Sequence, residues 1–187
     1  MSNLLAGDGV IIEWLNGIVG GSARVRRKLN GFFDYNDTAT AATPITLPAD
    51  TWVTVTNNGL GAFSNSSYPP TDVTNLMNTM TGDFDFSELE LGDNVLVRND
   101  FTVTPSVDNS VLELRYQLGT GPDAYTLEHI EAQYQSGSGK PYRSSLVPHM
   151  VYMGDTNTQG NPVRLQLKLS VAGTVVNAGS VVWSGKR

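Results

Sequence analysis

The sequence of 187 residues contains no cysteine. This absence excludes a disulfide framework, a cysteine-ligated zinc site and a thiol nucleophile. Stability must therefore come from a packed core or from burial between subunits. Charged residues are also scarce, at 16% of the chain, where ordinary domains carry about 25%. A surface so poor in charge suits a densely packed assembly or a secreted β protein better than a cytosolic enzyme.

Long apolar runs are missing as well. No stretch approaches the roughly 20 consecutive apolar residues of a membrane span, so we expect no membrane partner. The first residues, MSNLLAGDGVIIEWL, have no basic stretch and carry Asp8 and Glu13 among their apolar residues. That is not the pattern of a secretory signal peptide, and we expect none.

The basic residues are few and unevenly placed. The formal net charge is −6, yet four of the twelve basic residues fall within five positions, at Arg24, Arg26, Arg27 and Lys28. A nucleic-acid patch would need interleaved aromatic residues or basic support elsewhere in the chain, and neither is present. We expect these four residues to decorate a strand and meet acidic groups, with no nucleic-acid partner.

What the chain has in abundance is strand pattern. Residues 163–171, VRLQLKLSV, alternate apolar and polar side chains without a break, which predicts a β-strand with one buried face. Similar segments recur between Gly, Asn, Asp and Pro turn signals, and helix–strand alternation typical of parallel sheets is absent. We predict one all-β domain of eight to ten strands, a jelly roll or β-sandwich, over residues 24–187. The predicted strands lie near 24–34, 45–47, 52–56, 84–91, 95–103, 111–118, 125–134, 146–155 and 163–171, with a terminal hairpin over 172–187.

Three local features of this domain are expected to interrupt the strands. Asn30–Gly31 predicts a turn or bulge. Asp72 is expected to cap a short helical turn over residues 73–80, with Val73, Leu76, Met77 and Met80 on one side. The chain is expected to end in a hairpin, with Val175 and Val176 before its turn and Val181, Val182 and Trp183 after it.

Residues 1–23 differ from this domain and predict a short N-terminal arm. Six apolar residues have the spacing of a short amphipathic helix: Ile11, Ile12, Trp14, Leu15, Ile18 and Val19. Gly17, Gly20 and Gly21 weigh against that helix, at about 1 kcal/mol each. Two alternatives stay open, because the arm either packs on its own domain or docks on a neighbouring protein.

Catalytic and metal-binding patterns are weak throughout. The two histidines, His129 and His149, fall in different predicted strands without a metal-ligand spacing. Carboxylates cluster at Asp83, Asp85, Glu88 and Glu90, which we interpret as a solvated strand face, with calcium binding as the alternative. Serine motifs of hydrolases are absent. We expect no enzyme activity, no metal site and no cofactor.

Aromatic residues offer a further alternative. Six of them would suit a sugar-binding face if they were exposed together, although core or subunit contacts are the simpler expectation: Trp52, Tyr68, Tyr125, Tyr134, Tyr142 and Tyr152.

Two long segments carry a resemblance to a known family. They are LELGDNVLVRNDFTVTPSVDNSVLELRYQLG, residues 89–119, and the final residues 146–187, which begin LVPHMVYMGDTNTQGNPVRLQLKLSV. With their Gly–Asp turn and paired long strands, they resemble the jelly-roll domains of bacteriophage virion proteins with a tumour-necrosis-factor or C1q-like fold. These include head fibres, capsid cement proteins and tail-fibre tips. The resemblance implies a non-enzymatic homotrimer packed about a threefold axis, with no active-site residues to carry over.

Length selects among these proteins, because the chain has no shaft repeats or coiled-coil heptads. The resemblance then implies a capsid decoration, or cement, protein on the surface of the virion, assembled in the host cytoplasm and bound to the major capsid protein or another virion protein. We expect its N-terminal part to be the anchor, through Ile11, Ile12, Trp14, Leu15, Ile18, Val19, Arg24, Arg26, Arg27 and Lys28.

Two other functions stay open. The first is a tail-fibre tip that touches host surface glycan through the loops at 60–80, 119–124 and 135–145. The second is a monomeric, lectin-like carbohydrate-binding module that uses exposed tyrosine and tryptophan.

Overall fold

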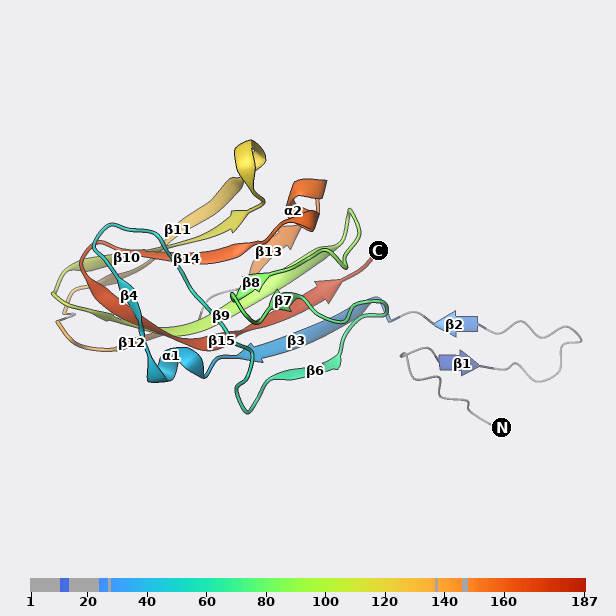
Figure 1. The fold of residues 1–187 in the computed structure, drawn as a ribbon, viewed down its shortest axis with the longest axis horizontal. Helices are drawn as coiled ribbons and strands as arrows, with labels where there is room; N and C mark the ends of the chain where they lie inside the picture. The colour runs from blue at the N-terminus through green and yellow to red at the C-terminus, as the bar shows by residue number, and fades with distance from the viewer. Residues whose placement is uncertain (1–10, 14–23, 27, 137, 146–147) are drawn as a thin grey trace, which may run out of the picture.

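The structure is a computed structural model that describes residues 11–13, 24–26, 28–136, 138–145 and 148–187. Its body is a sandwich of two antiparallel sheets, drawn in Figure 1. The all-β sandwich expected from the sequence is confirmed. No helix in the described ranges has the length and apolar character needed to cross a membrane.

The seven-stranded sheet has the order β12–β9–β15–β3–β6, with β13 also paired to β9 and β4 to β15. These strands are β3 (Asn30–Asn36), β4 (Ile45–Leu47), β6 (Asn65–Tyr68), β9 (Asn94–Pro105), β12 (Tyr142–Ser145), β13 (His149–Tyr152) and β15 (Gly173–Gly185).

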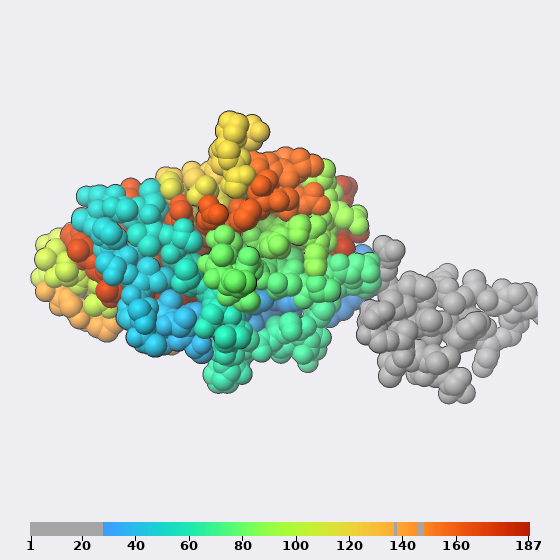
Figure 2. Space-filling model, in the orientation of Figure 1, coloured from blue at the N-terminus to red at the C-terminus, as the bar shows by residue number. Residues whose placement is uncertain are grey.

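The four-stranded sheet has the order β11–β10–β14–β5. These strands are β5 (Val53–Thr54), β10 (Ser110–Leu118), β11 (Tyr125–Tyr134) and β14 (Arg164–Leu169). The remaining elements of the sandwich are short: α1 (Ala39–Ala42), β7 (Met77–Asn78), β8 (Asp83–Phe84), η1 (Gly121–Asp123) and α2 (Thr156–Gly160). Figure 2 shows the segment around η1 projecting from the body.

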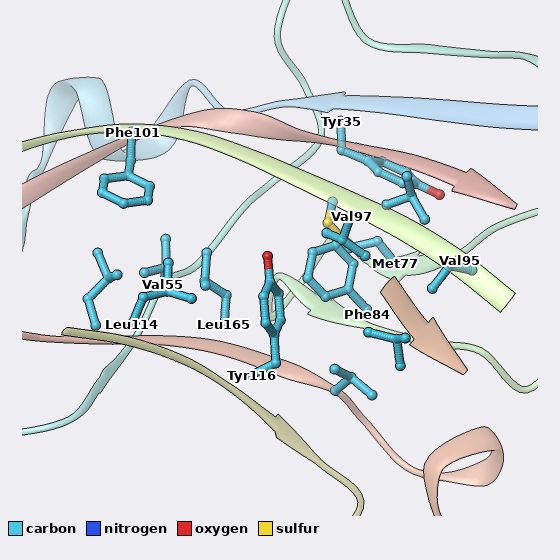
Figure 3. Packing of buried hydrophobic residues seen from close by; sticks show 14 of the residues in the cluster. Tyr35, Val55, Met77, Phe84, Val95, Val97, Phe101, Leu114, Tyr116 and Leu165 are labelled. Carbon is cyan, nitrogen blue, oxygen red and sulfur yellow. The ribbon is translucent and has the colours of Figure 1, made fainter. Parts of the chain in front are cut away.

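The core lies between the sheets and follows from the period of two in their strands. In β14, Leu165, Leu167 and Leu169 are buried while the residues between them are partly exposed. Figure 3 shows Phe101 of β9 pointing toward the side of the core that holds Leu114 of β10. The apolar residues at every second position of these strands thus face inward and form one apolar layer between the two sheets.

A row of three buried, hydrogen-bonded polar side chains crosses this apolar layer. Tyr116 of β10 pairs its hydroxyl with Asn99 of β9, and the Asn99 Oδ1 accepts a hydrogen bond of 2.6 Å from Ser180 of β15. Burial raises the pKa of Tyr116, with the Asn99 hydrogen bond opposing that rise. Because buried polar groups are costly unless they are paired, these hydrogen bonds favour one alignment of the two sheets.

The predicted terminal hairpin is wrong, because residues 173–185 form one continuous strand. The Asn-Ala-Gly sequence that suggests a turn instead makes a β-bulge, with the register shifting between Asn177 and Gly179. The side chain of Asn177 accepts a hydrogen bond from the Gly179 backbone, and Ala178 accepts one from the Asp37 backbone. Gly179 has φ 149, and an added Cβ would lie 2.6 Å from the Tyr35 carbonyl oxygen.

Two further local predictions are also wrong. Residues 73–80 form no helical turn; they include the strand β7, and Met80 is 94% exposed. Asn30 and Gly31 begin β3 instead of making a turn. A Cβ on Gly31 would lie 2.3 Å from the Tyr68 carbonyl oxygen, so this glycine permits close approach of the neighbouring chain.

The described part of the N-terminal segment is a separate two-stranded antiparallel sheet, β1 (Ile11–Glu13) and β2 (Arg24–Arg26). The predicted helix is therefore wrong at Ile11 and Ile12, where β-branched residues favour a strand. The other residues of that predicted helix, and one residue of the basic cluster, lie outside the described residues: Trp14, Leu15, Ile18, Val19 and Arg27.

Candidate interaction surface

Around Trp52, the outer face of the four-stranded sheet is covered by its own charged side chains. Two cations lie over the Trp52 ring, with the Arg115 guanidinium 4.2 Å and the Lys168 ammonium 4.9 Å from the ring centroid. Arg115 also pairs with Glu128 at 3.2 Å, and Lys168 pairs with Glu113 at 2.9 Å. These cation–π contacts and ion pairs satisfy the charged groups around Trp52, while Ile130, opposite Glu113 on β11, stays 64% exposed.

The outer face of the seven-stranded sheet carries an apolar row instead. Strand register pairs Met150 with Leu96, Leu96 with Trp183, Trp183 with Phe32, and Phe32 with Tyr68. These five residues, the apolar row, run across β13, β9, β15, β3 and β6 over about 19 Å. Met150 is 62% exposed, Tyr68 52% and Trp183 39%. The row is thus an exposed apolar strip on a sheet face.

A charged hollow adjoins the apolar row. Its volume is about 260 Å³, and its lining includes Asp34, Arg98, Asp100 and Arg143. The hollow lies on the same sheet face, two residues along each strand from the row. There, Val181 of β15 pairs with Arg98 of β9 on one side and with Asp34 of β3 on the other. Arg98 donates to Asp100 at 3.1 Å, whereas Arg143 makes no ion pair with any described residue.

The acids of this hollow are incompletely neutralised. Burial raises the pKa of Asp34; Arg98 opposes that rise, and the neighbouring Asp100 adds to it. The Oδ1 atom of Asp100 is buried and has no hydrogen-bond partner among the described residues. One guanidinium, that of Arg98, therefore lies beside two carboxylates.

The basic residues predicted to anchor the chain are only partly placed. Arg24 and Arg26 lie in β2. Lys28 is exposed; its backbone N–H donates to Thr71 Oγ1 at 2.8 Å, and its ammonium lies 5.5 Å from the centroid of the Tyr68 ring. Lys28 thus lies at the β6 end of the apolar row, a position that its sequence neighbours do not reveal.

The aromatic residues considered for sugar binding do not share one face. Trp52 is covered by its two cations, as described above, and Tyr134 stacks on Tyr142 at 4.4 Å between ring centroids. Tyr68 and Tyr152 are exposed on the seven-stranded sheet. Two members of the apolar row, Phe32 and Trp183, are absent from that sequence-based set.

The structure brings the two histidines together across the sandwich. His129 of β11 stacks on His149 of β13, with ring centroids 4.7 Å apart and planes 18° apart. Glu131 lies 3.3 Å from His129 Nε2. Stacked rings do not aim their nitrogen lone pairs at one point, and among the described residues no group of three or more His, Cys, Asp or Glu is placed to hold a metal ion.

The acidic cluster at 83–90 serves local structure. Asp83 pairs with Arg164 at 3.3 Å, and Asp85 accepts a hydrogen bond from the Ser87 backbone at 3.0 Å. Glu88 accepts hydrogen bonds from Thr74 and from the Asn75 backbone. Glu88 thus fixes the loop around residues 71–90, while Asp83 and Asp85 also line a hollow of about 410 Å³ beside Asn161.

Comparisons of the sequence and the fold with known proteins add little to this description of the surface. No protein-family model and no curated protein matches the chain. Among solved structures, one titled as the infectious bursal disease virus Gt strain is similar over 100% of this chain, with 12% identity and a TM-score of 0.43. The Gx strain structure is similar over 94%, with 9% identity and a TM-score of 0.40. This chain covers 45% and 38% of those chains, and such low scores assign no function.

Proposed function

We propose that this chain is a non-enzymatic structural protein of a bacteriophage particle, a homotrimer that decorates the capsid and attaches to the major capsid protein or another virion protein through its N-terminal part. The observation that carries the proposal is the apolar row. An exposed apolar strip, rimmed by charged residues on a sheet face, is typical of a surface that contacts another protein.

The geometry of the row favours a protein partner over a sugar. Phe32 and Tyr68 stack on each other, with ring centroids 5.3 Å and planes 18° apart. Each ring therefore covers one face of the other, so this pair offers a sugar fewer open aromatic faces than two separate rings would. Apolar protein side chains need no such open face, so the tail-tip and lectin-like functions receive less support from this surface.

The N-terminal segment supports attachment in a different way. An isolated two-stranded sheet such as β1–β2 is only marginally stable without a packing partner. Its strands include Ile11, Ile12 and Val25 together with Arg24 and Arg26, and a segment with both apolar and basic residues fits a protein surface with both apolar and acidic groups. We assign attachment to this segment and to Lys28.

The test uses particles of the virus that encodes the chain. Full-length protein is added to particles stripped of accessory proteins, and bound protein is located by immunogold labelling and by image reconstruction. We expect regular decoration of the capsid surface. A chain lacking residues 1–23 should keep the thermal melt of the sandwich and lose attachment. Decoration by the truncated chain would refute the anchor, and the absence of full-length protein from every particle would refute the virion role.

A further inference from the structure

We infer that the apolar row and the adjoining charged hollow form the contact between copies of this chain, which leaves the capsid contact to the N-terminal segment. This inference rests on the proposed function, because that function requires both kinds of contact. It deepens the proposal by naming the face and the residues through which copies meet.

The first argument is the charge of this face. The whole chain has a net charge of −6, so two copies repel each other over most orientations. The charged hollow holds two carboxylates, Asp34 and Asp100, and two guanidinium groups, Arg98 and Arg143, whose charges cancel. Two copies can therefore approach through this face without adding to the repulsion.

The second argument is that the hollow holds one surplus group of each sign. Arg98 is engaged by Asp100, which leaves Asp34 with a hydrogen bond from Asn36 at 2.7 Å but no ion pair, and Arg143 with no ion pair, among the described residues. One face meets two neighbours at once only where it lies against the threefold axis of a closed trimer, and we place this face there; every copy then offers the same two groups to its neighbours. Arg143 of one copy can therefore pair with Asp34 of the next, and each copy gives and receives one such contact.

The third argument is size. Tyr152 of β13 is 56% exposed beside the row, and with the three exposed row members it presents apolar area on the order of 400 Å². A stable contact needs about 800 Å² from each partner, with an apolar centre and a polar rim. The row supplies such a centre, and the charged hollow supplies part of the rim.

The first experiment places a charge in the row. Trp183→Glu is compared with the unaltered chain by light scattering coupled to size-exclusion chromatography, over a range of protein concentrations. Ile130→Glu is the matched control, because Ile130 is 64% exposed on β11 of the other sheet. We expect the unaltered chain and Ile130→Glu to contain three copies per particle, and Trp183→Glu to be a monomer with at least a tenfold weaker association constant.

The second experiment exchanges the surplus charges. Arg143→Glu should weaken association, because it places an acid opposite the acidic Asp34 of the next copy. Adding Asp34→Arg to that variant should restore association to within a few-fold of the unaltered chain, since the pair is re-formed with reversed signs. Circular dichroism melts of all variants identify any loss of folding.

The outcomes separate this inference from the proposed function. A trimer that survives Trp183→Glu with its melt unchanged overturns the inference and leaves virion attachment to its own test. An unaltered chain that stays monomeric at every concentration also overturns it. If that monomer still decorates particles and Trp183→Glu prevents decoration, the row contacts a capsid protein instead.

Discussion

The two sheets each place a tryptophan on their outer face, and the surroundings of these residues differ. Trp52 is contacted by Arg115 and Lys168, whose cations lie over its ring and are themselves held by carboxylates. Trp183 lies between Leu96 and Phe32 of neighbouring strands and stays 39% exposed. The residue type is the same in both places. The neighbours on the adjacent strands therefore decide whether a surface tryptophan is covered by its own sheet or stays available to a partner.

The largest effect is expected from breaking the bulge that shapes the seven-stranded face. Gly179→Val adds a Cβ that would meet the Tyr35 carbonyl oxygen and the Asn36 backbone in a φ region that valine avoids. We expect a loss of about 3 kcal/mol or more in unfolding free energy, measured by urea denaturation. Gly160→Ala is the control, because its Cβ meets no atom within 4 Å. Equal stability of the two variants would show that the bulge tolerates a side chain.

The next effect separates the two tryptophans directly. Trp52→Ala removes two cation–π contacts and should lower unfolding free energy by about 2 kcal/mol, with no change in particle mass. Trp183→Ala should lower the stability of the dilute monomer by about 1 kcal/mol, through lost packing on Leu96 and Phe32, and weaken self-association. Thermal melts and light scattering on both variants make the comparison. The same response from both tryptophans would remove the distinction between the faces.

A smaller effect concerns Asp34. Because its pKa is raised in the folded chain, the charged carboxylate costs stability at pH values above that pKa. The cost disappears below the ordinary value of 3.8, where the group is protonated in both folded and unfolded chains. Asp34→Asn should therefore stabilise the dilute monomer at pH 7 by roughly a few tenths of a kcal/mol, since screening is strong near the surface. It should weaken self-association at the same time.

Denaturation of the Asp34→Asn variant at pH 7 and pH 3.5, together with light scattering at pH 7, measures both effects. A variant less stable than the parent monomer at pH 7 would contradict the assigned sign.

The smallest effect is expected on the four-stranded face. The hydrogen bond from Arg115 is the main cause that lowers the pKa of Glu128. A lowered pKa contributes stability above the ordinary value of 4.5, and that stability is lost as the pH falls through the folded-state pKa. Since the Glu128 side chain is 47% exposed and its ion pair is screened by solvent, Glu128→Gln should leave Tm at pH 7 within about 1 °C and leave mass unchanged. A clear fall in Tm would mean that the ion pairs around Trp52 act as a cooperative network.

The sequence predicts the strands well where both faces of a strand have distinct surroundings. Residues 163–171 alternate without a break and contain β14. The predicted strands 95–103 and 111–118 likewise lie within β9 and β10, whose residues alternate in burial. The inward side of β11 is unclear from its sequence because β11 is an edge strand with mostly exposed residues on both sides. Alternation reports burial, so it fades where a strand leaves the core.

The candidate surface is harder to predict, because it depends on register between strands. The sequence places Phe32, Trp183 and Met150 in or near strands, but their distances along the chain say nothing of which residues lie opposite one another. The bulge at 177–179 adds a further shift, and its Asn-Ala-Gly sequence is equally typical of a turn. Only the alignment of β13, β9, β15, β3 and β6 assembles the apolar row.

The junction between the N-terminal segment and the sandwich has a mechanical consequence. The chain enters through Lys28 and Leu29, whose carbonyls accept hydrogen bonds from Thr71 and Lys186, and then runs as β3 antiparallel to β15 over residues 30–36. Tension applied through the N-terminal segment acts along β3, parallel to its strand direction. The hydrogen bonds to β15 are then loaded in shear, so they must yield together and not one after another. If the N-terminal segment anchors the protein to a particle, a force on that anchor passes into β3 of the seven-stranded sheet. The hydrogen bonds between β3 and β15 resist a pull along the length of β3.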